Sequence, residues 1–263
     1  MNKFEKLKKI LGRMESVVIA YSGGLDSTFL LKAAASVLGN KVLAVTAVSP
    51  TYPGEELAVA CKMANKMGVK HKVIKTNELK NRRFSANNAD RCYFCKKELF
   101  GKLTGIARRE KLAFVLDAGN ISDKRDFRPG SSAGREMGVR SPLKEAGFTK
   151  TDIRRLSKEL GLPTWDKPAE ACLASRIPYG TAISKETLSR IHSAERILRG
   201  LKFRQVRLRH YNGLCRIEVP RRDIPELIKK RNLIVERFKE LGYNYITVDL
   251  EGYRTGSMNE VLK

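Results

Sequence analysis

The chain has 263 residues, of which 42% are hydrophobic, so it can form one large or two modest domains and is not a disordered chain. Lysine and arginine total 52 against 28 aspartates and glutamates, and the net charge of +24 favours anionic partners such as nucleotides, nucleic acid or anionic lipid. No apolar run approaches the roughly 18 residues of a membrane span, and the charged start lacks the apolar stretch of a signal peptide, so we expect a cytoplasmic protein without membrane spans.

The first 165 residues alternate between strand patterns and helix patterns. The strand patterns cover 16–21, 41–48, 71–76 and 112–118, and the helix patterns cover 27–38, 54–68 and a stretch after Cys95. Strands that alternate with helices favour a parallel sheet covered on both faces. We therefore expect an α/β fold with a Rossmann-like parallel sheet over residues 1–165, with ligands beyond the carboxyl ends of its strands.

The pattern changes after this domain. Residues 166–183 are proline-containing and show little periodicity, so we interpret them as an interdomain loop. Residues 184–263 predict a smaller α+β domain, with a helix over 184–199, strands over 203–211 and 214–219, a helix over 224–241 and a strand over 245–250. Asn212-Gly213 separates the first two of these strands and is a strong hairpin signal.

The most informative motif is Ser22-Gly23-Gly24-Leu25-Asp26-Ser27, between the first predicted strand and the first predicted helix. The two glycines, Gly23 and Gly24, let backbone N–H groups approach a phosphate, and the following helix adds the positive end of its dipole. Ser22 and Ser27 supply hydroxyls, and Asp26 can hold Mg²⁺ beside the phosphates. The alternative is an ordinary glycine turn with a serine cap, which the strand context disfavours.

The loop has no Gly-Lys-Ser/Thr, so the lysine that a P-loop places on the phosphates is missing from it. It resembles instead the Ser-Gly-Gly-x-Asp-Ser signature of the PP-loop ATP pyrophosphatase superfamily. That resemblance implies that ATP is cleaved between its α- and β-phosphates. AMP then passes to a substrate oxygen, and pyrophosphate is released.

Polar residues also follow the fourth predicted strand. Asn120, Asp123 and Arg128 come where the nucleotide of such a sheet is expected, so they are candidates to bind ATP or Mg²⁺. The alternative is a polar loop that caps the next helix.

Cys92 and Cys95 are three residues apart, just ahead of a predicted helix, a spacing that suits metal or cluster ligation. A single pair is only half of a site, because zinc takes four ligands, so a further thiol has to come from elsewhere in the chain. Cys61 and Cys215 lie on apolar faces of their predicted elements, and we interpret both as core packing.

Cys172 lies in the predicted interdomain loop, with Arg176 four residues on. A thiol near a cation in such a loop is a reasonable nucleophile or metal ligand, and a structural role is the alternative.

Four segments, 22–27, 91–96, 126–130 and 171–180, together resemble the ATP-dependent sulfur transferases of nickel-pincer nucleotide synthesis (the LarE family), over nearly the whole chain. The resemblance implies that a carboxylate of pyridinium-3,5-biscarboxylic acid mononucleotide is adenylated and then converted to a thiocarboxylate. In one branch of the family the cysteine that matches Cys172 gives up its own sulfur and becomes dehydroalanine. In another branch three cysteines hold a 4Fe-4S cluster. Because Cys92 and Cys95 accompany Cys172, this chain is similar to the cluster branch.

The resemblance also implies roles for the second domain. Arg207 and Arg209 alternate along one strand and share a face, and they match arginines near the substrate phosphate. Arg176 is expected to bind substrate with them, and a solvated basic face is the alternative. Glu195 lies at the flank of an apolar helix stripe, where a carboxylate needs a partner. It matches an acidic residue near the reactive cysteine, so we expect a catalytic role.

The same resemblance implies the expected partners: further copies of the chain, in a hexamer in this family, and a downstream nickel-insertion enzyme. Nucleic acid is disfavoured as a partner.

A PP-loop tRNA thiolase remains an alternative function because of the charge, although the chain lacks added Cys-x-x-Cys pairs for zinc knuckles. An ammonia-using ligase such as a GMP or NAD synthetase also stays open, and it would need no reactive thiol. The last alternative is a nucleotide-binding regulator without turnover.

Overall fold

The computed structural model describes residues 2–52, 54–125, 129–168 and 171–262. The chain forms two compact units. Unit 1 comprises Met1–Asn81 and Asp90–Glu170, and unit 2 comprises Arg82–Ala89 and Ala171–Lys263. Asn87 ties the short segment 82–89 to unit 2, because its side-chain amide donates hydrogen bonds to the carbonyls of Pro178 and Thr181, at 2.7 and 2.8 Å.

Unit 1 is built on a parallel sheet, which within the described residues has four strands in the order β3-β2-β1-β4. The strands are β1 (Val17–Ala20), β2 (Val42–Val48), β3 (Lys70–Lys75) and β4 (Phe114–Leu116). The predicted Rossmann-like α/β fold is confirmed. Because β2 and β4 lie on opposite sides of β1, the strand order reverses there, and a crevice for ligands is expected at the carboxyl ends of β1 and β4.

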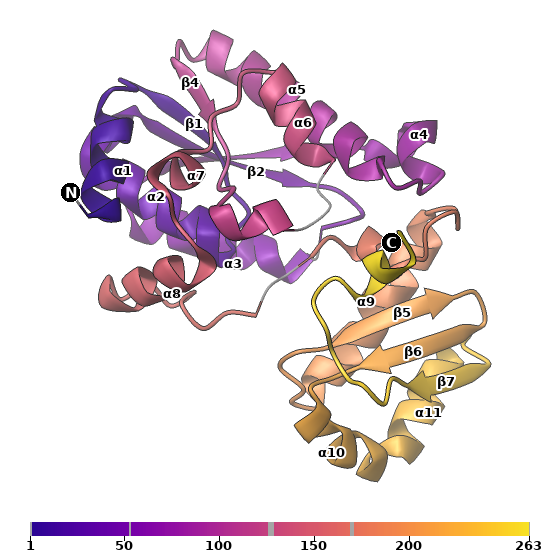
Figure 1. Cartoon of the computed structure of the whole chain (residues 1–263). Helices are drawn as coiled ribbons and strands as arrows, with labels where there is room; N and C mark the ends of the chain where they lie inside the picture. Colours follow the sequence, from indigo (N-terminus) through magenta and orange to yellow (C-terminus); the bar gives the residue numbers. More distant parts are fainter. Residues whose placement is uncertain (1, 53, 126–128, 169–170, 263) are drawn as a thin grey trace. The chain divides into compact units, whose positions relative to one another are not determined.

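Helices cover both faces of this sheet (Figure 1). They are α1 (Lys3–Gly12), α2 (Leu25–Leu38), α3 (Gly54–Lys66), α5 (Arg91–Arg109), α6 (Gly130–Glu136), α7 (Pro142–Ala146) and α8 (Lys150–Glu159). Val17 and Ile19 of β1 join one apolar core, with α1, α2, α3, α7 and α8. Val18 joins a second core with α5 and α6. This alternation is what a central strand buried on both faces requires.

The helix after β3 begins earlier than the sequence predicts. Because α5 starts at Arg91, Cys92 and Cys95 lie inside its first turns and not ahead of it. The sequence pattern also missed α1, α6, α7 and α8. Of these, α8 carries a capping box, in which Thr149 accepts from the Asp152 amide and Asp152 accepts from the Thr149 amide.

Unit 2 contains a sheet that, within the described residues, has three strands in the order β5-β6-β7. Its strands are β5 (Arg207–Tyr211), β6 (Leu214–Glu218) and β7 (Tyr245–Val248), and its helices are α4 (Arg82–Ser85), α9 (Lys185–Gly200), α10 (Ile224–Lys229) and α11 (Arg231–Glu240). Tyr211 pairs with Leu214 in an antiparallel register, so the hairpin predicted at Asn212-Gly213 is confirmed. The helix predicted over 224–241 is divided at Lys230. Figure 1 shows α9 and α11 on the same side of this sheet.

In the part of the chain that the structure describes, no helix is both long and apolar enough to cross a membrane.

Candidate functional site

A cluster of hydroxyl groups forms where β1 ends. The side-chain oxygens of Ser22 and Ser27 are 3.1 Å apart, and the Ser22 amide donates to Ser27 Oγ at 3.3 Å. Ser27 Oγ donates to the Gly24 carbonyl at 3.2 Å. From the β2–α3 loop, the Tyr52 hydroxyl donates to the Ser22 carbonyl at 2.9 Å. The loop is thus closed at the start of α2, where unpaired helix N–H groups and the helix dipole favour an anion.

Gly23 is required by the shape of this loop. Its φ is +71°, a backbone conformation that residues other than glycine rarely adopt. A Cβ atom added there would lie 2.9 Å from Ala60 Cβ, on the neighbouring helix α3. The loop therefore lies directly against α3, and a larger residue would push the two apart.

Lys150, at the start of α8, supplies a cation to the loop. Its Nζ lies 2.6 Å from Asp26 Oδ2, and Asn120 Nδ2 lies 3.4 Å from the same oxygen. Lys150 was not among the site residues predicted from the sequence, although the Thr149-x-x-Asp152 capping signal marks the start of its helix. The fold thus brings a lysine to the predicted phosphate loop, Ser22–Ser27, whose own sequence has no lysine.

The loop after β4 contributes Asn120, whose side chain is buried and reaches Asp26 as described above. Asp123 Oδ2 accepts the Asn120 amide at 3.0 Å, and Asp117 Oδ1 accepts the Gly119 amide at 3.0 Å. Asp123 therefore shapes this loop, while the Asn120 side chain lies beside Asp26. Arg128 lies outside the described residues.

The thiols differ in their exposure. Cys92 is exposed and Cys95 is half-buried, three residues apart on α5 and therefore on neighbouring positions of one helix face. Burial raises the pKa of the Cys215 thiol to about 12, so Cys215 is a core residue as predicted. Cys61 is only half-buried, which is less than core packing predicts.

The start of α6 lies against the start of α5, because a Cβ at Gly130 would be 2.9 Å from Lys96 Cγ and 3.2 Å from the Cys92 carbonyl oxygen.

Among the described residues, no three histidine, cysteine, aspartate or glutamate side chains gather as metal ligands. Cys92 and Cys95 belong to unit 1, and Cys172 belongs to unit 2.

Cys172 is exposed and directly precedes a 3₁₀ turn, Leu173–Arg176. Arg176, in contrast, is completely buried. Its Nε and Nη2 donate to the two oxygens of Glu195 at 2.8 and 3.0 Å, and its Nη1 donates to the Cys172 carbonyl at 3.0 Å. The structure thus brings Cys172, Arg176 and Glu195 together within unit 2, as three consecutive links of one hydrogen-bonded chain.

Glu195, on α9, is also completely buried. It accepts the Leu208 amide at 3.1 Å and Arg199 Nη2 at 3.0 Å in addition to Arg176. Burial raises its pKa, but the positive charge of Arg176, with those of Arg207 and Arg199, outweighs burial and holds the pKa below its ordinary value. The carboxylate is therefore ionised, and the partner that the sequence analysis required for it is Arg176.

Arg207 and Arg209 lie on one face of β5, as predicted, but both are buried, so the alternative of a solvated basic face is wrong. Arg209 Nε and Nη2 donate to Glu218 at 2.8 and 2.7 Å. Arg207 lies over the Tyr253 ring, 5.4 Å from its centroid. Glu218 was not among the residues predicted from the sequence, although the hairpin register, which pairs Glu218 with Arg207, could have revealed it.

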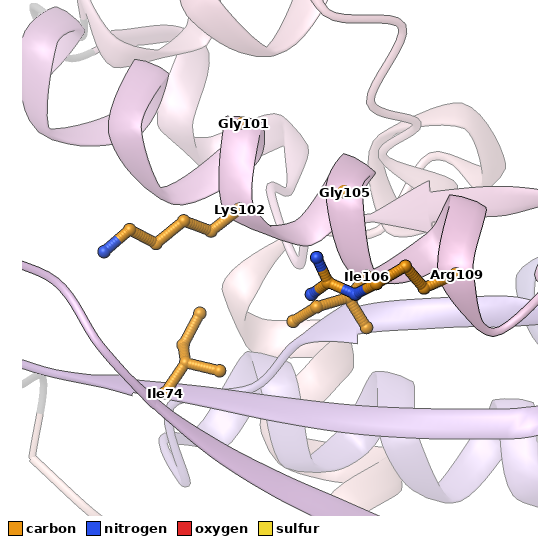
Figure 2. Close-up of a pocket in the computed structure, with 6 residues that line it drawn as sticks. All are labelled: Ile74, Gly101, Lys102, Gly105, Ile106 and Arg109. Atoms are coloured by element: carbon orange, nitrogen blue, oxygen red, sulfur yellow. The ribbon is translucent and has the colours of Figure 1, made fainter.

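A cavity of about 280 Å³ lies elsewhere in unit 1, between α5 and the edge strand β3. Figure 2 shows Ile74 of β3 facing Lys102 and Ile106 of α5 across it. None of the site residues predicted from the sequence lines this cavity.

Known proteins resemble this chain over nearly its whole length. Residues 16–99 match the family model described as Queuosine biosynthesis protein QueC. The chain is 38% identical over 250 residues to the pyridinium-3,5-bisthiocarboxylic acid mononucleotide synthase of Lactiplantibacillus plantarum, which covers 95% of this chain and 91% of that protein. It is 44% identical to an uncharacterized protein of Synechocystis sp. (99% of this chain, 98% of the relative). It is 31% identical to an uncharacterized protein of Methanocaldococcus jannaschii, over 97% of this chain and 98% of that relative.

Proposed function

Because the chain belongs to the family of the pyridinium-3,5-bisthiocarboxylic acid mononucleotide synthases, we propose that it is an ATP-dependent sulfurtransferase of nickel-pincer nucleotide synthesis. It converts a carboxylate of pyridinium-3,5-biscarboxylic acid mononucleotide into a thiocarboxylate. The observation that carries this proposal is the similarity to the named synthase over 95% of the chain. The match of residues 16–99 to a PP-loop family supports the use of ATP.

In the first step, an oxygen of the substrate carboxylate attacks the α-phosphorus of ATP. The bond from the α-phosphorus to the β-phosphate oxygen breaks, and pyrophosphate leaves. The N–H groups at the start of α2 and the hydroxyls of Ser22 and Ser27 would bind the departing phosphates. Lys150 would balance their negative charge.

Asp26 fits a magnesium ligand, because a carboxylate at the strand-end crevice is a hard oxygen donor of the kind that Mg²⁺ takes beside phosphates. When bound there, Mg²⁺ would neutralise phosphate charge. Asn120 would orient Asp26 through its amide, and the proposed nucleotide ligands Gly23, Gly24, Asp123 and Arg128 would complete the site.

In the second step, sulfur attacks the acyl carbon of the adenylate and AMP leaves with the electrons of the broken C–O bond. Cys172 is proposed as the residue that presents this sulfur, because its thiol is exposed and sits on a fixed turn. If the sulfur is its own, the thiolate first forms a thioester. Loss of the Cα proton then breaks the Cβ–S bond, which leaves dehydroalanine and the thiocarboxylate.

The alternative source of sulfur is a 4Fe-4S cluster held by Cys92, Cys95 and Cys172. The resemblance to the cluster branch supports this alternative, and each of the three thiols is exposed or half-buried, while thiolates are the ligands that clusters take. When bound, the cluster would supply an iron with an open position for a sulfide. The buried Cys215 is unsuited to this role.

The test is mass spectrometry of anaerobically prepared protein before and after turnover with ATP and the biscarboxylate nucleotide. Formation of AMP, pyrophosphate and the thiocarboxylate is expected. A brown protein with about four irons and an unchanged mass supports the cluster as donor, whereas a colourless protein that loses about 34 Da supports Cys172 as donor. Thiolation of tRNA by the purified protein, or amidation with ammonia by a Cys172→Ser variant, would overturn the proposal.

The proposed setting is the cytoplasm. The proposed partners are further copies of the chain, in a hexamer, and a downstream nickel-insertion enzyme that receives the thiocarboxylate product. The net charge of +24 favours anionic substrates such as ATP and the mononucleotide.

A further inference from the structure

Two buried arginines of unit 2 hold the backbone of residues 171–175, the segment that contains Cys172. Arg176 Nη1 donates to the carbonyls of Ala171 and Cys172, at 2.5 and 3.0 Å. At the other end of the turn, Arg209 Nη1 donates to the Ser175 carbonyl at 3.1 Å. The backbone on both sides of the exposed thiol is therefore fixed by buried guanidinium groups.

Each of these arginines is fixed in turn by a buried glutamate. Arg176 is paired through two nitrogens with Glu195 of α9, and Arg209 is paired through two nitrogens with Glu218 of β6. Glu195 is anchored to β5 through the Leu208 amide. We name the four residues Arg176, Glu195, Arg209 and Glu218 the arginine bracket.

The groups of the arginine bracket are already occupied. Both oxygens of Glu195 accept hydrogen bonds, Oε1 from Arg176 and Leu208, and Oε2 from Arg176 and Arg199. Glu195 and Arg176 have no exposed surface. In this arrangement neither a substrate phosphate nor a reacting proton can reach them without breaking a buried, charge-assisted bond.

Stability alone is a weak reason for such pairs. Removing two charges from water costs free energy that their attraction only partly returns, and apolar residues of similar size often stabilise a core as well. A planar guanidinium held at two nitrogens, with a third nitrogen on backbone carbonyls, does something that apolar residues cannot do, because it fixes the direction of those carbonyls.

We propose that Arg176 and Glu195 are positioning residues for Cys172, and that they do not bind substrate or exchange a proton with it. Arg209 and Glu218 brace the opposite end of the same turn. This inference rests on the proposed function for the importance of Cys172, but the arrangement itself can be tested without turnover.

The test uses Arg176→Lys in the full-length protein. Lysine keeps the charge opposite Glu195, but its single nitrogen cannot hold both the glutamate and the carbonyls of Ala171 and Cys172. In hydrogen exchange, the Ser175 amide, which donates to the Cys172 carbonyl at 2.9 Å, reports on the turn. We expect exchange over residues 171–177 to become about tenfold faster, with strands β5 and β6 unchanged.

The matched control is Arg199→Lys. Arg199 donates to the same carboxylate and, among the contacts between described residues, makes no hydrogen bond to the Ala171 or Cys172 carbonyl, so hydrogen exchange over 171–177 should stay as in the parent protein. If Arg176→Lys does not fold, the double variant Arg176→Gln/Glu195→Gln removes both charges of the pair together and should give the same local acceleration.

Kinetics separate positioning from binding. For Arg176→Lys we expect kcat for thiocarboxylate formation to fall about tenfold or more, with the KM for the mononucleotide and the ATP–pyrophosphate exchange unchanged. A raised KM with unchanged kcat would overturn the inference. So would unchanged hydrogen exchange over residues 171–177, or hydrogen exchange that becomes faster evenly over the whole of unit 2. Absence of sulfur transfer in the parent protein would refute the proposed function, while the hydrogen-exchange result would still decide the inference.

Discussion

Lys150 Nζ lies 2.6 Å from Asp26 Oδ2, although the two residues are 124 positions apart in the chain. The pair joins the start of α8 to the phosphate loop at the start of α2. It supplies a positive charge that the loop sequence lacks, and it is only partly buried, so an incoming phosphate can compete for the lysine.

Removal of Lys150 is expected to weaken the first reaction step. In Lys150→Ala, the ATP–pyrophosphate exchange rate should fall about tenfold to hundredfold, because one preorganised cation is lost from the departing phosphates. Lys8→Ala is the matched control, since Lys8 also pairs with a carboxylate, that of Glu5 within α1, at 2.9 Å. Equal effects of the two substitutions would contradict the assignment of Lys150.

Gly23→Ala is expected to damage the phosphate loop. The added methyl group meets Ala60 at 2.9 Å, and φ is +71°, so the free energy of unfolding should fall by about 2–3 kcal/mol. Gly68→Ala separates the two causes, because its φ is +66° and nothing lies within 4 Å of the added atom. Urea unfolding should give a loss of about 1 kcal/mol for Gly68→Ala, and ATP titration should show weaker binding for Gly23→Ala only.

The capping box of α8 is expected to lose its contribution to the stability of the folded protein in acid. Partial burial raises the pKa of Asp152, but hydrogen bonds from Lys3 and Thr149 more than offset this and lower the pKa to about 2, against 3.8 for the free group. A folded-state pKa below the unfolded one stabilises the protein above pH 3.8, and this contribution disappears as the pH falls toward 2.

Asp152→Asn measures that contribution. The parent protein should exceed the variant by about 1 kcal/mol in free energy of unfolding at pH 6, after allowance for solvent screening, and the difference should shrink between pH 4 and pH 2. A difference that stays constant over this range in acid titrations followed by circular dichroism would show that the charge of Asp152 is not its cause.

The cysteines are expected to differ in whether their replacement lowers the iron content of the protein. If the cluster is present, Cys92→Ala, Cys95→Ala and Cys172→Ala should each lower the iron content and bleach the anaerobic protein, because each removes one of three thiolate ligands. Cys61→Ala is the control that should keep its iron. Iron analysis with absorption spectra measures this difference, and full iron retention in Cys92→Ala would refute the proposed ligand set.

Much of the fold was predictable because it depends on local patterns. The strands of unit 1 follow from short β-rich runs, and the hairpin of unit 2 follows from Asn212-Gly213 between alternating strands. The helices α6 and α7 were missed, since elements this short show little helical periodicity. The start of α5 was placed too late because the segment from Arg91 to Lys97 was interpreted through its cysteines.

The sequence by itself determined the class of chemistry, since the Ser22–Ser27 motif and the position of Cys172 are local features. Only the tertiary structure decided which charges meet. It paired Asp26 with Lys150, Arg176 with Glu195 and Arg209 with Glu218. Asp26 and Lys150 are 124 positions apart, and Glu195 lies on α9 while Arg176 lies on a separate turn, so these two pairs depend on how separate elements pack and not on spacing along the sequence. A buried charge needs a partner, but the sequence does not say which one.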